Sequence, residues 1–316
     1  MFGAKTNITD EKIFEAFVLG LKKDGVRDIH IEPSFGKQRI RVRRGTVLKY
    51  LNIANDKIDA IVSQLKTRAH FNNALRLVPT VSEFNYKGLK FKVFGLPVID
   101  GEKIFVRITD TKNVVSSLSK LGMKESGEEL IKNVIRQKKG LILVLGEGRT
   151  TTMFSIFSLL DAHRQNLISV ENHPSYRLDG VNQYVIDKNW SELAEKAVKI
   201  ASRQWADAVL ISQIDSPELA NHAIELAMNQ ALVVASVPTS DPFFAISYLR
   251  GLGVQPFLIA HCLKLVMFQR LVLFGGKITG EFGFVQLTDD FRRYILADLP
   301  AAELQKIAVE KHNVIS

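Results

Sequence analysis

The chain is poor in cysteine, with Cys262 as the one thiol among 316 residues. A single thiol excludes an internal disulfide framework and a cysteine-rich zinc cluster, and it fits a reducing compartment. Long apolar runs are also missing. The longest, residues 257–274, is interrupted by charged and polar side chains, whereas a bilayer span needs about 20 nearly continuous apolar residues. We therefore predict a buried helix that runs into a strand here. Residues 1–17 lack the apolar core of a signal peptide, so we expect a cytoplasmic protein.

Acidic residues are scarce in the first third of the chain. Residues 1–112 contain 21 Lys and Arg against 12 Asp and Glu, whereas the 21 basic and 21 acidic residues of 113–316 cancel. The whole formal net charge of +9 therefore belongs to the N-terminal third. This asymmetry indicates two units with different tasks, which we place at 1–112 and 113–316.

The two units differ in their expected secondary structure. In 1–112, hydrophobic spacing predicts a helix at 10–24, a hairpin at 28–44, a helix at 56–70 and two strands within 88–108, which together make a small α+β domain. In 113–316, helices and short apolar strands alternate, which predicts an α/β core with a parallel sheet covered on both faces. The predicted helices there are 123–137, 151–162, 191–204, 217–229, 242–251 and 256–268, and the strands are 141–145, 167–171, 207–212 and 231–236.

The stretch "VLGEGRTTT" (144–152) is close to a phosphate-binding loop, G-x-x-x-x-G-K-[ST]. Gly146 and Gly148 lie two positions apart where the motif has five, so the loop is three residues shorter and offers fewer backbone N–H groups to a phosphate. Arg149 stands in the place of the lysine, and its planar fork does not replace a compact ammonium. Thr150 and Thr151 keep hydroxyls at the start of the predicted helix. Chance, a working variant and a disabled copy all remain possible from this stretch alone.

Seven segments in order give the chain a family resemblance. They are "RDIHIEP" (27–33), "RIRVRRGTVL" (39–48), "GEKIFVRITD" (101–110), "KGLILVLG" (139–146), "ISVENHPSYRLDGVNQ" (168–183), "SRQWADAVLISQIDSPELA" (202–220) and "GVQPFLIAHCLKLVMFQRLV" (253–272). With them the chain resembles the hexameric motor ATPases of type IV pili and type II secretion, of the pilus-extension and secretion type. The resemblance implies a RecA-like P-loop core, here 113–316, preceded by a smaller PAS-like α+β domain.

The resemblance also shows where the chain departs from the family pattern. Gln213 stands where the family has a glutamate that orients the attacking water, and glutamine can neither take a proton nor add charge for magnesium. Glu171 is retained, but Asn172 and Ser175 replace neighbouring acids, and Pro238 replaces a histidine. We therefore treat Glu171 and Gln213 as relic positions and expect no catalytic residues and no metal site.

We expect a catalytically inactive pseudo-ATPase that acts as a structural or regulatory subunit of a pilus or secretion machine. The resemblance implies a homo- or hetero-hexamer with an active motor ATPase paralogue, at the inner membrane through platform or cytoplasmic pilus-assembly proteins. The first alternative is an active ATPase with an atypical loop, which would bind ATP or ADP with magnesium. Its nucleotide-binding residues would be Gly146, Gly148, Arg149, Thr150 and Thr151, with Arg107 from the first domain.

The strand "KQRIRVRR" (37–44) carries a basic face. Strand alternation places Arg39, Arg41 and Arg43 on one side and Ile40 and Val42 on the other. A solvated sheet face would account for this pattern, and a nucleic-acid-associated module is the second functional alternative. No recognised nucleic-acid-binding module or stacking-aromatic pattern accompanies the basic residues, so we expect an acidic protein surface as the partner.

Overall fold

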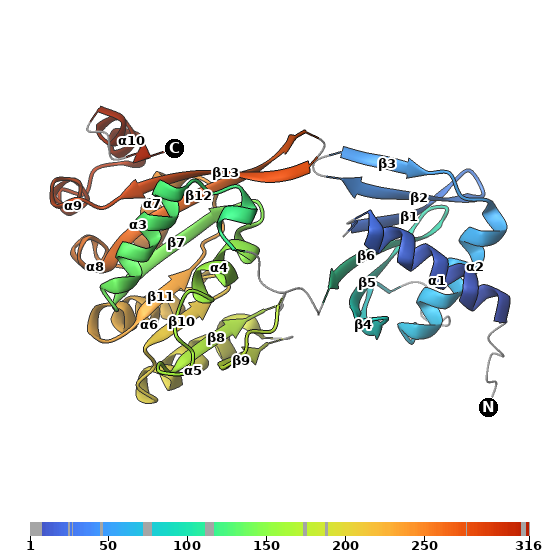
Figure 1. The fold of residues 1–316 in the computed structure, drawn as a ribbon, viewed down its shortest axis with the longest axis horizontal. Coiled ribbons are helices and arrows are strands. Elements are labelled where there is room, and N and C mark those ends of the chain that lie inside the picture. The colour runs from blue at the N-terminus through green and yellow to red at the C-terminus, as the bar shows by residue number, and fades with distance from the viewer. Residues whose placement is uncertain are drawn as a thin grey trace. The chain divides into compact units, whose positions relative to one another are not determined.

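The computed structural model describes residues 8–24, 26, 28–44, 47–71, 78–110, 117–172, 176–186, 189–275, 277–310 and 314–315. The chain forms two compact units, Met1–Asn113 and Val114–Ser316 (Figure 1). Each unit has its own hydrophobic core. The boundary that we predicted at 112 falls within 111–116, outside the described residues. In the part of the chain that the structure describes, every helix is too short or too polar to cross a membrane.

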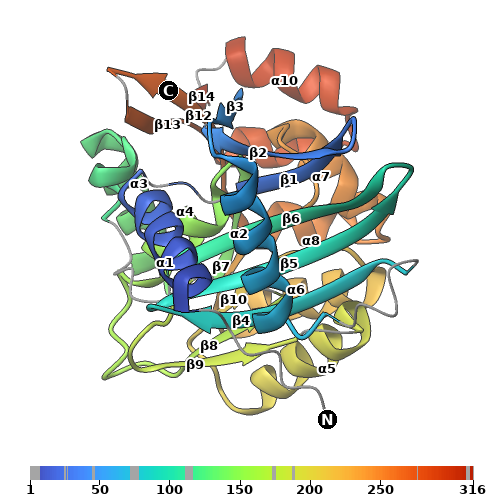
Figure 2. The same ribbon diagram turned by 90° about the vertical axis from the view of Figure 1, so that its right-hand side faces the viewer.

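The first unit is a six-stranded antiparallel sheet with helices on one face (Figure 2). Strand order is β3-β2-β1-β6-β5-β4. The alternating residues Ile29, Ile31, Ile40 and Val42 are buried in the core that the helices complete. The elements are α1 (Ile8–Lys23), β1 (Asp28–Ser34), β2 (Lys37–Arg44), β3 (Val47–Leu51), α2 (Asn55–Arg68), β4 (Thr80–Tyr86), β5 (Leu89–Val98) and β6 (Gly101–Asp110).

The second unit is built on an eight-stranded sheet of order β14-β13-β12-β7-β11-β10-β8-β9. The strands from β12 to β9 in this order are parallel, and β13 and β14 are antiparallel. The elements are η2 (Ser119–Leu121), α3 (Glu125–Arg136), β7 (Gly140–Gly146), α4 (Arg149–Phe157), β8 (Leu167–Glu171), β9 (Val181–Val185), α5 (Trp190–Arg203), β10 (Ala208–Ile211), α6 (Pro217–Asn229), β11 (Leu232–Ala235), α7 (Pro242–Gly251), α8 (Pro256–Cys262), β12 (Leu263–Phe274), β13 (Lys277–Gln286), α9 (Asp289–Leu296), α10 (Ala301–Glu310) and β14 (Val314–Ile315).

Helices cover both faces of the parallel sheet, as the central strand β7 shows. Its residues Leu141, Leu143 and Leu145 belong to the core shared with α5 to α10, while Ile142 and Val144 belong to the core shared with α3 and α4. A strand that is apolar at successive positions is expected when both faces are buried. The predicted α/β class with a parallel sheet is therefore confirmed.

Two predicted helices in this unit have the wrong extent. The helix expected at 256–268 ends at Cys262, because the chain continues as strand β12 from Leu263. β12 lies inside the sheet, where Leu265, Val266 and Met267 are all buried, so its apolar residues do not alternate and the segment resembles a buried helix in sequence. The helix expected at 151–162 covers 149–157 instead.

Candidate functional site at the carboxyl edge of the parallel sheet

The shortened loop joins β7 to α4 through two glycines in the left-handed region of the backbone. Gly146 has φ of 90° and Gly148 has φ of 77°, values that residues with a Cβ adopt only at a cost. Gly148 is also the N-terminal cap of α4, so the helix begins at once with Arg149. In open α/β sheets, ligands bind at the carboxyl ends of the strands, and this loop lies at that end of β7.

The loop is packed directly against the neighbouring strand β12. Gln269 pairs with Gly146 in the sheet register, and its side-chain Nε2 donates a hydrogen bond to the carbonyl oxygen of Glu147. A Cβ added to Gly146 would overlap the Gln269 carbonyl oxygen, and one added to Gly148 would lie 2.9 Å from Gln269 Nε2. The buried Gln269 thus supports the loop from one side. We did not predict a role for it from the sequence.

Arg149 connects the loop to the end of β10. Its Nη2 donates to Oε1 of Gln213 over 3.3 Å, and its Nη1 makes a long contact of 3.5 Å with the carbonyl oxygen of Gly146. Burial lowers the pKa of Arg149, but a guanidinium stays charged at neutral pH. The structure therefore brings together Gly146, Arg149 and Gln213 as a half-buried contact between a cation and a neutral amide.

The threonines that open α4 are partly engaged in internal contacts. The hydroxyl of Thr151 lies 2.9 Å from the hydroxyl of Tyr176, and Thr152 is buried within the helix. Thr150 is half-buried in the first turn. Ser175, which precedes Tyr176, lies in 173–175, outside the described part of the chain.

Glu171 belongs to a buried network between β8 and β9. Its Oε1 accepts hydrogen bonds from Ser169 Oγ at 2.5 Å and from Gln183 Nε2 at 2.8 Å. The residue is fully buried, and burial raises the pKa of its carboxyl group although both hydrogen bonds act in the opposite direction. A carboxyl group in this setting holds two strands together through its acceptor oxygen.

Two buried polar atoms beside the loop lack hydrogen-bond partners among the described residues. They are Nε of Arg149, a donor, and Oε1 of Gln269, an acceptor. Unsatisfied buried groups of this kind are uncommon in folded proteins and call for an explanation. They show that the closed loop satisfies its polar groups incompletely.

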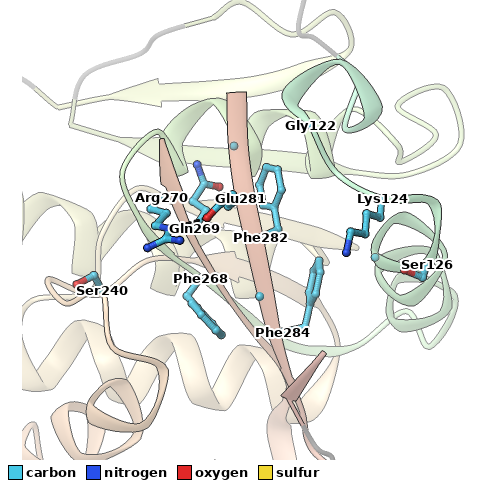
Figure 3. A pocket seen from close by; sticks show the side chains of 13 residues that line it. Gly122, Lys124, Ser126, Ser240, Phe268, Gln269, Arg270, Glu281, Phe282 and Phe284 are labelled. Atoms are coloured by element: carbon cyan, nitrogen blue, oxygen red, sulfur yellow. Dashed lines mark hydrogen bonds and ion pairs between the residues drawn. The ribbon is translucent and has the colours of Figure 1, made fainter. Parts of the chain in front are cut away.

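A hollow of about 610 Å³ lies next to Gln269, between β12, β13 and the start of α3 (Figure 3). Phe268, Phe282 and Phe284 give it an apolar lining, with Lys124 on the helix side. In the phenylalanine-rich segment 281–291, Phe284 and Phe291 are buried, but Phe282 keeps part of its surface exposed on the hollow. The described residues form no group of three potential metal ligands.

The basic face of the first unit is partly neutralised. Ile40 and Val42 are buried, as predicted, and Arg39, Arg41 and Arg43 lie on the other face of β2. Glu32, from β1, is buried and pairs with Arg39, Arg41 and Lys103. Burial alone would raise the pKa of its carboxyl, but Arg41 and Lys103 lower this pKa to about 2.

Two further contacts tie the basic residues into the first unit. Tyr50, on the unpredicted strand β3, lies under the guanidinium groups of Arg39 and Arg41. Arg107 pairs with Asp28 at 2.9 Å within the same sheet. These contacts favour a structural role for much of the face over nucleic-acid binding.

A family model described as "Type II/IV secretion system protein" matches residues 5–278. The chain belongs to this family. Among its curated members, the putative type II secretion system protein E of Escherichia coli (strain K12) is 28% identical over 269 residues, which are 83% of this chain and 55% of that protein. The type II secretion system protein HxcR of Pseudomonas aeruginosa is 29% identical, with 83% and 57% covered. The chain thus spans about half the length of the curated family members it matches.

Solved structures of secretion and pilus ATPases share the fold. The Legionella pneumophila ATPase DotB superposes with a TM-score of 0.74 at 16% identity, covering 95% of this chain and 86% of DotB. The pilus retraction motor PilT with bound ADP superposes with a TM-score of 0.67 at 18% identity, covering 95% and 89%. At 16% and 18% identity, the structural likeness to these ATPases shows a shared fold and does not show a shared activity.

Proposed function

We propose that the chain is a catalytically inactive member of the type II/IV secretion family. It acts as a structural or regulatory subunit of a pilus or secretion machine, in a ring of its own copies or with an active motor ATPase. The observation that carries the proposal is the support of the shortened loop by Gln269 beneath Gly146. The loop is held against β12 with one residue between its glycines, which leaves too few backbone N–H groups to surround a phosphate.

The remaining residues fit magnesium and a triphosphate poorly. A phosphate loop works because successive backbone N–H groups converge on one phosphate, and this loop has only Glu147 between its glycines. Arg149 is directed to the amide of Gln213, and that amide takes the place of the acid that would act on water. Loss of a general base alone typically costs about two to four orders of magnitude in rate.

Calorimetric titration of the full chain with Mg-ATP, together with a phosphate-release assay, tests the proposal. We expect no saturable heat and no phosphate release. We expect the same for Gln213→Glu, because restoring the acid does not reopen the loop. Saturable binding with turnover that disappears in Arg149→Ala, while the thermal midpoint stays unchanged, would overturn the proposal.

The proposed role in a machine has its own measurement. We expect the chain to co-sediment with an active motor ATPase of the family from the same cell, as part of one ring. We also expect the chain to change the rate at which that motor hydrolyses ATP. Absence of any effect on assembly or rate would contradict the structural or regulatory role while leaving the loss of catalysis standing.

Two observations favour a second candidate, an active ATPase with an atypical loop. Arg149 Nε is a buried donor without a described partner, and the hollow beside Gln269 has the volume of a small-molecule pocket. In that case Arg149, Thr150, Thr151 and Glu171 would act at the nucleotide, with Arg107 from the first unit. The same titration and assay decide between the two candidates.

A further inference from the structure

Two tight hairpin turns lie at the same end of the sheet in the first unit. The β1–β2 hairpin closes with Ser34 opposite Lys37, and the β5–β6 hairpin closes with Val98 opposite Gly101. Because β1 and β6 are antiparallel neighbours, the end of β1 and the start of β6 lie side by side, so both turns lie at the same end of the strands. Figure 2 shows the two turns together at the right-hand end of the strands. With strands about 4.8 Å apart, the two turns are separated by about 10 Å.

Each turn presents an apolar residue to water at its first position. Phe35 is 98% exposed and Ile99 is fully exposed. Leu96 and Val98, just before the second turn, are 49% and 37% exposed. We call these four residues the apolar tip. Large exposed apolar side chains that gather at one end of a folded domain favour a contact with a protein or a membrane.

Phe35 is also in an unfavourable backbone conformation. It has φ of 48° and the following Gly36 has φ of 75°, the positive pair found in the tight hairpin turns where Asn-Gly is preferred. A bulky side chain with positive φ is a genuine outlier. Neither burial nor turn geometry explains a phenylalanine here, so its side chain points to a contact made outside the fold.

The charges around the apolar tip complement an anionic surface. Lys37 directly follows the first turn and is exposed, and Lys103, just after the second turn, keeps 38% of its side chain exposed while it pairs with Glu32. Asp100 lies within the second turn, and Glu102 follows it and pairs with Lys66. Together with Arg39 and Arg41, which pair with Glu32, five cations here stand against three carboxylates. Residues 1–112 as a whole carry a surplus of nine positive charges. Protruding apolar side chains flanked by cations fit a lipid surface. The apolar side chains can enter the region between the headgroups and the acyl chains, and the cations can contact anionic headgroups.

We propose that the apolar tip of the first unit inserts into an anionic lipid surface, with Phe35 and Ile99 as the inserting side chains. The contact gives the chain a membrane attachment of its own, independent of nucleotide and of partner proteins. The proposal does not depend on whether the second unit hydrolyses ATP, so the two can fail separately.

Vesicle sedimentation of the full chain tests the attachment. We expect binding to vesicles of equal parts phosphatidylcholine and phosphatidylglycerol, no binding to phosphatidylcholine alone, and weaker binding as salt is raised. Phe35→Asn combined with Ile99→Ser is expected to weaken binding about tenfold, and Asp100→Asn to strengthen it. Asparagine tolerates positive φ better than phenylalanine, so Phe35→Asn alone is expected to raise the thermal midpoint of the chain. Weaker vesicle binding by this single variant would then not reflect misfolding.

The matched control is Val47→Ser, which removes an apolar side chain that is 56% exposed on β3, at the opposite end of the sheet from the turns, where Val47 pairs with Arg44. It is expected to leave vesicle binding unchanged. Equal binding by the Phe35 and Ile99 variants and the original chain would overturn the proposal. So would absence of vesicle binding together with self-association that the same variants abolish, since the apolar tip would then be an interface between copies.

A fluorescent label separates insertion from electrostatic adsorption. Cys262 is buried, and burial raises the pKa of its thiol to about 12, so a cysteine introduced as Ile99→Cys can be labelled selectively with an environment-sensitive dye. Vesicles should shift the emission of this label to the blue and leave a label at Val47→Cys unchanged. Equal behaviour of the two labels would contradict insertion.

Discussion

Glu32 shows how a single side chain sets the electrostatics of the first unit. Its carboxyl faces Arg39, Arg41 and Lys103. Burial would raise the pKa of this carboxyl, but Arg41 and Lys103 hold it at about 2 instead of 4.5. A depressed pKa in the folded state contributes stability that is present above the unfolded value of about 4.5 and is lost as the pH falls through about 2.

We therefore expect Glu32→Gln to lower the free energy of unfolding by about 2 kcal/mol at pH 7, allowing for screening of the partly exposed cations. The gap between the two proteins should shrink between pH 5 and pH 2, measured by urea denaturation. Glu83→Gln is the matched control, because Glu83 pairs with Lys90 and Lys92 at a more exposed site and should lose no more than about 1 kcal/mol. A gap for Glu32→Gln that stays constant down to pH 3 would contradict the assignment.

At the scale of single elements, the loop between β7 and α4 shows what the sequence could and could not predict. Gly146, Gly148 and Arg149 could be singled out because the spacing of a phosphate loop is local. The contact between Arg149 and Gln213 follows from the rule that parallel strands end at one edge. Gln269 could not be found, because β12 was predicted to be helical as far as 268. Only as a strand parallel to β7 does this segment place Gln269 opposite Gly146.

The first unit gives the same lesson at β3. The sequence "VLKYL" does not alternate regularly between apolar and polar residues, and the burial of the strand is irregular too. Alternation therefore did not indicate a strand here, and the position of β3 is set by its pairing with β2. The aromatic partner Tyr50 of the basic face was missed for this reason. The sequence predicted those elements in which apolar residues repeat with a regular helical or strand period. The remaining elements form because of pairing with strands distant in the sequence.

The packing of the loop against β12 makes a prediction about its glycines. Gly146→Ala should cost at least about 3 kcal/mol, since it combines left-handed backbone with overlap on Gln269. Gly148→Ala should cost about 1–2 kcal/mol, because its neighbour at 2.9 Å is a flexible side-chain end. Gly251→Ala is the control in helix α7, where nothing lies within 4 Å of the added Cβ, and it should stabilise by up to about 1 kcal/mol. Thermal denaturation of the three variants checks the order, and a Gly146→Ala protein as stable as Gly251→Ala would show that the loop is not held against β12.

At the scale of the whole molecule, two units with separate cores are expected to unfold as separate cooperative blocks. The first core is formed within α1 to β6, and the second unit has cores on both faces of its sheet. Glu32 and Gly146 lie in different units, so their variants can serve as probes. In calorimetry, Glu32→Gln should lower one transition and leave the other in place, and Gly146→Ala should do the reverse. Fragments 1–113 and 114–316 should each reproduce one of the two transitions. If both variants shift a single common transition by similar amounts, the units fold as one block, and a substitution at the apolar tip would then be felt at the loop that follows β7.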